Sequence, residues 1–152
     1  MASFGVTHFL QVIFESFRIY IPIVEAHSGL LLKVEGDSMM VLFRRPELAL
    51  KCAIAMQQAS HAYNGDRDDA EKLLLSIGLG YGKVLKFGDQ DVYGSEVNVA
   101  CKLGEDLGRH WSIQCSDGFH VAVKDGPGLK LVKAQATPLG TPQAWELEYE
   151  PG

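Results

Sequence analysis

The sequence predicts an α+β domain in which helices pack on one face of a mostly antiparallel sheet. Apolar residues recur at helical spacing near the N-terminus, later apolar runs are rich in β-forming residues, and the two kinds of segment alternate. Their order is helix, hairpin, helix, hairpin, helix and closing strands, which favours helices packed against an antiparallel sheet. A chain of 152 residues has the size of one domain, so we expect residues 1–152 to form a single domain.

A first helix is expected from Phe4 to about His27. Pro22 should kink this helix or split it into two, because proline cannot donate a backbone hydrogen bond. Gly29 should end it. The apolar residues that recur at helical spacing are Val6, Leu10, Ile13, Phe17, Ile21 and Val24.

A hairpin and a second helix are expected next. Residues 30–35 and 38–43 favour β-strands, and Gly36-Asp37 between them suits a tight turn. Pro46 suits the first turn of a helix, and the alanine-rich sequence after it predicts a helix that ends between residues 59 and 63.

The second half of the chain predicts one more hairpin, one more helix and three short strands. The glycine-rich residues 73–87 resemble a buried hairpin, and residues 95–107 a helix. A strand is expected at 112–115. Two edge strands are expected near 130–133 and 145–149, because prolines interrupt the tail of the chain.

Composition excludes several classes of function. The net charge of −5 argues against a broad nucleic-acid surface. No apolar run approaches the length of a membrane span, and the N-terminus lacks the pattern of a secretory signal, so no membrane contact is expected from this segment. The three cysteines are unpaired in number and lack metal-binding spacing, which indicates buried free thiols in a reducing cytoplasm.

Three motifs contain charged residues within or beside apolar runs, where an unpaired charge is costly. They are Lys33-Val34-Glu35-Gly36-Asp37, the run 77–84, and Asp91-Val92-Tyr93-Gly94 leading to Val97-Asn98-Val99-Ala100. In this order and spacing they resemble the class III nucleotidyl cyclases over roughly residues 6 to 120. The resemblance implies a ferredoxin-like nucleotidyl cyclase fold. It also implies conversion of ATP to cyclic AMP and pyrophosphate, with two Mg²⁺ or Mn²⁺ ions, at the interface of a homodimer.

The resemblance implies roles for three residues of the first and third motifs. Asp37 matches a metal-binding aspartate, and carboxylate oxygens suit Mg²⁺ or Mn²⁺. The alternative interpretation is an ordinary turn aspartate. Lys33 and Asp91 match the pair that selects adenine, since an ammonium donor and a carboxylate acceptor complement the pairing edge of that base. Their alternative is a salt bridge without a ligand.

The resemblance also implies two catalytic residues on the helix expected at 95–107. Asn98 matches the asparagine that orients the ribose. Lys102 stands where the family usually has an arginine that stabilises the pentavalent phosphate. Residues four apart share one face of a helix, so both side chains can reach one site. Lysine keeps the charge but loses the planar fork of arginine, which predicts a lower rate. The alternative for Lys102 is an exposed lysine without a catalytic role.

One part of the family pattern has no counterpart in this sequence. A ferredoxin-like core begins with a strand before its first helix, and in the cyclases that strand bears the second metal-binding aspartate and a Gly-Phe loop. Only Met1-Ala2-Ser3 precede the helical pattern here. We therefore expect the 152-residue chain to be weakly active or inactive. The alternative function is a non-catalytic cyclase-homology module for dimerisation or nucleotide sensing. An RNA-binding sheet fits poorly, because the chain is acidic and lacks the aromatic-rich strand motif.

Overall fold

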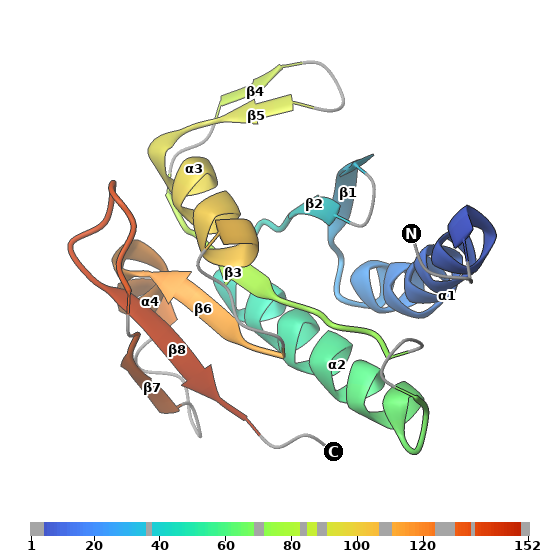
Figure 1. The fold of residues 1–152 in the computed structure, drawn as a ribbon. Helices are drawn as coiled ribbons and strands as arrows, with labels where there is room; N and C mark the ends of the chain where they lie inside the picture. Colours follow the sequence, from blue (N-terminus) through green and yellow to red (C-terminus); the bar gives the residue numbers. More distant parts are fainter. Residues whose placement is uncertain are drawn as a thin grey trace.

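The computed structural model describes residues 5–35, 38–68, 72–82, 85–87, 91–106, 111–123, 130–134 and 136–149. For residues 5–14, 33, 35, 85–87, 91–93 and 105–106 it describes the backbone alone. Within these ranges it is an α+β structure, as the sequence predicts, with helices packed on a sheet that is mostly antiparallel (Figure 1). No helix in the described part of the chain is both long and apolar enough to cross a membrane.

The central sheet has four strands in the spatial order β3-β6-β8-β7. The two outer pairs differ in direction: β3 runs parallel to β6, whereas β8 is antiparallel to both β6 and β7. The strands are β3 (Ile77–Leu79), β6 (Ile113–Ser116), β7 (Lys130–Lys133) and β8 (Ala144–Glu148).

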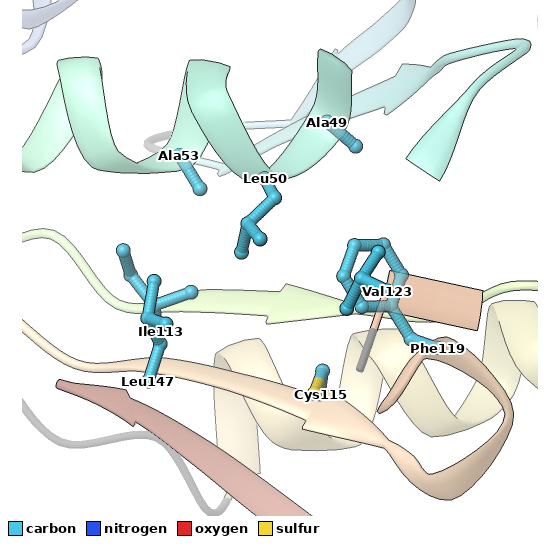
Figure 2. Packing of buried hydrophobic residues seen from close by; sticks show 8 residues of the cluster. All are labelled: Ala49, Leu50, Ala53, Ile113, Cys115, Phe119, Val123 and Leu147. Atoms are coloured by element: carbon cyan, nitrogen blue, oxygen red, sulfur yellow. The ribbon is translucent and has the colours of Figure 1, made fainter. Parts of the chain in front are cut away.

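One face of this sheet is covered by α2 (Pro46–Asn64) and α4 (Asp117–Val123). Leu50 points from α2 toward the sheet, where its cluster includes Ile113 of β6 and Leu147 of β8 (Figure 2). These side chains are almost completely buried, so the cluster forms the main hydrophobic core.

The opposite face of the β3 edge contacts α3 (Ser95–Cys101) and its continuation η2 (Lys102–Asp106). Ile77 and Leu79 pack on the α2 side, and successive strand residues point to opposite faces, so Gly78 faces α3. A Cβ atom at Gly78 would overlap the carbonyl oxygen of Ala100. Glycine is therefore required here by the close approach of the helix backbone.

A separate layer is formed by α1 (Gly5–Ala26), which packs along α2 through Tyr20 and Val24. Pro22 lies inside α1 and does not split it. The helix is followed by Ser28 in the left-handed region at φ 62°, while Gly29 makes room for the ring of Phe43. The hairpin of β1 (Leu30–Glu35) and β2 (Ser38–Leu42) follows, as expected.

The hairpin expected within residues 73–87 is wrong. Of these residues, 77–79 form β3, which pairs with β6, and 85–87 form β4, which pairs with β5 (Asp91–Tyr93). The glycines that suggested a turn have a different role, because a Cβ at Gly78 or Gly80 would collide with the backbone of α3. Tertiary contact, rather than chain reversal, explains these glycines.

Two further differences concern the C-terminal half. The strand expected at 145–149 is not an edge strand, because β8 lies between β6 and β7, whereas the strand expected at 130–133 is β7 and lies at an edge as predicted. The helix expected at 95–107 is present but changes to π-helical geometry at Lys102. The short helix α4, which begins directly after β6, was not predicted from the sequence.

Candidate functional site

The predicted site residues that are best defined in the structure are Asn98 and Lys102. Val99 and Leu103 are fully buried and hold the inner side of α3 and η2 against the sheet. Asn98 is exposed and Lys102 is half-buried. The backbone N–H of Lys102 donates to the carbonyl oxygens of Asn98 and Val99, at the junction of the α- and π-helical segments. The structure thus keeps both side chains on one short, firmly packed element.

The two residues predicted to read the base lie on separate hairpins. Lys33 lies in β1 opposite Met40, next to a shift in the strand register, and Asp91 begins β5 opposite Phe87. Figure 1 shows these hairpins apart, and the β4–β5 hairpin leads directly into α3. Only the backbone of Lys33 and Asp91 is described, so their contact with one purine stays a prediction.

The predicted metal ligand, Asp37, lies outside the described residues. The β1–β2 ladder closes with Glu35 opposite Ser38, so residues 36–37 form the two-residue connection between the strands. Carboxylate oxygens suit Mg²⁺ or Mn²⁺ when phosphate or further oxygen ligands complete the shell, and the metal role of Asp37 stays a prediction. Among the described residues, no group of three or more His, Cys, Asp or Glu side chains could hold a metal.

Glu96, in the first turn of α3, is not among the predicted site residues, but it makes several contacts beside them. Its Oε1 accepts hydrogen bonds from the backbone N–H of Tyr81 at 3.0 Å and from the hydroxyl of Ser116 at 2.5 Å. Gly82 and Gly118 lie so close that a Cβ on either would meet the Glu96 side chain at 2.7 Å. The spacing of these glycines around an acidic helix start is the signal that could have identified Glu96.

Two of the three cysteines, Cys115 and Cys52, are poor candidates for a nucleophile. Burial, and after it the nearby Asp117 and Glu96 carboxylates, raises the pKa of the Cys115 thiol to about 12. Burial also raises the pKa of Cys52 to about 11. Thiols with such high pKa values stay protonated near neutral pH and are poor nucleophiles.

Comparison with known proteins gives two curated relatives. No protein-family model matches the chain. The chain is 35% identical over 99 residues to "Putative adenylate cyclase 3" of Rhizobium meliloti (strain 1021), an alignment that covers 65% of this chain. It is 30% identical over 82 residues, 54% of this chain, to the serine/threonine-protein kinase pkn2 of Myxococcus xanthus. The matched parts are only 16% and 10% of those two proteins, respectively.

Similar solved structures cover most of the chain. The adenylate/guanylate cyclase/hydrolase from Silicibacter pomeroyi has a TM-score of 0.77 and 25% identity, over 90% of this chain and 81% of that one. The adenylyl cyclase CyaB from P. aeruginosa has a TM-score of 0.71 and 20% identity, over 99% and 85%. The dimeric guanylyl cyclase domain of RhoGC from Blastocladiella emersonii has a TM-score of 0.73 and 15% identity, over 94% and 82%.

Proposed function

We propose that the chain, which resembles the class III adenylate/guanylate cyclase domains in sequence and in fold, converts ATP to 3′,5′-cyclic AMP and pyrophosphate in a homodimer. The observation that supports this most strongly is the placement of Asn98 and Lys102 on one element, directly after the hairpin that contains Asp91. The adenylate cyclase name of one relative and the dimeric state in the name of one structure agree with the proposal.

In this proposal Lys33 and Asp91 select the base. The Asp91 carboxylate accepts from the amino group of adenine, and the Lys33 ammonium donates to the neighbouring ring nitrogen. Guanine presents the reverse pattern and would leave both charged groups without a partner, which is costly in a site closed to water. ATP is therefore the proposed substrate rather than GTP, and its use fits a cytoplasmic location.

Asn98 and Lys102 act on the reacting part of the nucleotide. The ribose 3′-oxygen attacks the α-phosphorus, and the bond from that phosphorus to the pyrophosphate oxygen breaks. Asn98 orients the ribose, and the Lys102 ammonium offsets the negative charge that develops on the phosphoryl oxygens. Mg²⁺ or Mn²⁺, when bound through Asp37, would neutralise phosphate charge and favour ionisation of the 3′-hydroxyl.

The proposed rate is low for the 152-residue chain. Lysine at position 102 cannot grip two phosphoryl oxygens as an arginine fork does. Asp37 is the proposed metal ligand of this chain, so the rate should rise with the Mn²⁺ concentration until the metal site is saturated.

The test uses the full-length protein with ATP or GTP and Mn²⁺, and measures the cyclic nucleotide formed. ATP should be the better substrate, and Lys33→Ala, Asp37→Ala and Asn98→Ala should each lower the rate by about 100-fold. The matched control is Lys51→Ala, because Lys51 is exposed on α2. A wild-type rate in Lys33→Ala or Asp37→Ala would refute the assigned roles.

A second candidate function is a non-catalytic module that dimerises or senses nucleotide. Lys102 in the arginine position favours it, and the matched region in a serine/threonine-protein kinase shows that similar sequence occurs in a protein named for another activity. Adding ATP to the protein in the presence of Mn²⁺, and measuring both binding and cyclic AMP, distinguishes the two candidate functions. Saturable binding without turnover supports the module, and turnover supports the cyclase.

A further inference from the structure

Glu96 lies at a junction of segments that are far apart in the sequence. It is in the first turn of α3, two residues before Asn98, and its side chain is half-buried. Its Oε1 accepts from the backbone N–H of Tyr81, in the segment that follows β3, and from the hydroxyl of Ser116, the last residue of β6. One carboxylate oxygen thus links α3 to the segment after β3 and to the end of β6.

The hydrogen bonds of Glu96 extend into α4. Ser116 is fully buried, and its hydroxyl oxygen also accepts from the backbone N–H of Phe119 at 3.1 Å, so that it caps the first turn of α4. Phe119 in turn belongs to the main core. Glu96 is therefore connected through Ser116 to a rigid part of the molecule.

The glycines around Glu96 indicate that its position is tightly constrained. A Cβ at Gly82 would lie 2.7 Å from the Glu96 Cγ, and a Cβ at Gly118 would lie 2.7 Å from its Oε1. Gly80 lies against the carbonyl oxygen of Glu96 itself. Three glycines on two segments thus leave the space that this one side chain and its backbone occupy.

The α3 helix needs such an attachment because it is short. It has seven residues, and isolated helices of this length are not stable in water. Gly94, which precedes its first turn, has no side chain to cap it. Val99 and Leu103 anchor the apolar side and the C-terminal part, and Glu96 makes the polar attachment at the N-terminal end. Together these anchors fix the direction of the helix axis, and with it the direction of Asn98.

We propose that Glu96 is a positioning residue that orients Asn98 and Lys102 by fastening the first turn of α3 to Tyr81 and Ser116. This inference rests on the proposed cyclase function. Glu96 acts through the helix and does not itself contact the nucleotide. Its loss should therefore disturb the geometry needed in the transition state while leaving ATP binding by the two hairpins nearly unchanged.

The test compares Glu96→Ala, Glu96→Gln and the control Glu148→Ala in the full-length protein. Glu148 forms an exposed ion pair with Lys130 on the β7–β8 ladder. We expect Glu96→Ala to lower kcat about tenfold or more with KM for ATP nearly unchanged. Glu96→Gln should restore most of kcat, because its amide oxygen can accept both hydrogen bonds. A kcat within twofold of wild type in Glu96→Ala, or an equal loss in Glu148→Ala, would overturn the proposal.

Hydrogen exchange, followed by mass spectrometry, gives a readout independent of turnover. Peptides that cover residues 80–82 and 95–101 should exchange at least about tenfold faster in Glu96→Ala and near the wild-type rate in Glu96→Gln. Unchanged exchange in Glu96→Ala would overturn the proposal.

If the unaltered protein forms no cyclic nucleotide, the cyclase assignment fails. The hydrogen-exchange rates then still decide whether Glu96 holds α3 in place. If Glu96→Ala does not fold, a wild-type-like kcat and KM in Glu96→Gln supports the proposal and a tenfold lower kcat overturns it.

Discussion

The hydroxyl groups of Tyr20 in α1 and Ser60 in α2 form a buried hydrogen bond of 2.5 Å between the two helices. Ser60 also donates to the carbonyl oxygen of Met56 at 3.0 Å, so Tyr20 is the donor and Ser60 the acceptor in the bond between the helices. Burial raises the pKa of Tyr20. The bond fixes the position of α1 on α2 within an otherwise apolar cluster.

Tyr20→Phe should reduce the free energy of unfolding by about 1 kcal/mol, since it removes one buried neutral hydrogen bond. Urea denaturation of Tyr20→Phe, Ser60→Ala and the double variant measures the coupling between the two residues. The double variant should lose less stability than the two single losses combined. Strict additivity of the two losses would show that the bond contributes nothing to stability.

Lys102→Arg should raise the rate of cyclic AMP formation by about tenfold, or ~1.4 kcal/mol in the barrier, because a planar fork contacts two phosphoryl oxygens. Lys102→Ala should lower it by about 100-fold. The measurement is kcat with ATP and Mn²⁺, and Lys51→Arg on α2 is the matched control. If Lys102→Ala keeps the wild-type rate, Lys102 is only a helix-surface lysine.

Gly78→Ala should destabilise the protein by about 3 kcal/mol. The new Cβ would overlap the carbonyl oxygen of Ala100 and lie 2.6 Å from the backbone N of Gly104, so α3 and η2 would have to move away from β3. Gly104→Ala is the matched control at the same contact, because its Cβ would lie 3.3 Å from the nearest atom. Urea denaturation should show a smaller loss for the control, and equal losses would contradict the assigned role of Gly78.

Stability should fall as the pH is raised above 9. An unfolded cysteine releases its proton near pH 9.0, whereas folded Cys115 keeps its proton up to about pH 12 because it is buried. The stability from a raised folded pKa is complete below the unfolded value and is lost between the two values, since only the unfolded state gains by ionisation there. Thermal unfolding at rising pH measures the effect.

The control for the pH prediction is Cys115→Ala, in which this source of pH dependence is absent. Its melting temperature should decline less steeply above pH 9 than that of the wild type. Cys52, with a pKa of about 11, contributes in the same direction in both proteins. Identical slopes in the two proteins would show that Cys115 ionises equally easily in the folded and unfolded states.

Sequence patterns correctly predicted those elements whose structure depends on residues that are neighbours in the chain. Pro46 begins α2 as predicted, and β1 and β2 form the expected hairpin, since a turn and its two flanking strands are neighbours in the chain. Asn98 and Lys102 share one helical element for the same reason. Pro22 did not split α1, because the packing of that helix on α2 compensates for one lost hydrogen bond.

Sequence patterns did not predict those features that depend on contacts between segments far apart in the sequence. The parallel pairing of Ile77 with Ile113 joins residues far apart in the sequence, and no local signal specifies it. The glycines nearby were interpreted as a turn because contact with the α3 backbone cannot be seen in the sequence. Lys33 and Asp91 lie on separate hairpins, so the local sequence does not determine whether they face one ligand.

The parallel pairing of β3 and β6 has a consequence for how this domain can diversify. The chain leaves the sheet after Leu79 and rejoins it at Ile113, and the β4–β5 hairpin and α3–η2 lie in between. Both junctions are fixed by strand pairing on the main core. A change in the length of the connection between β3 and β6 should therefore leave the register of this strand pair unchanged, because the pairing of Ile77 with Ile113 determines it.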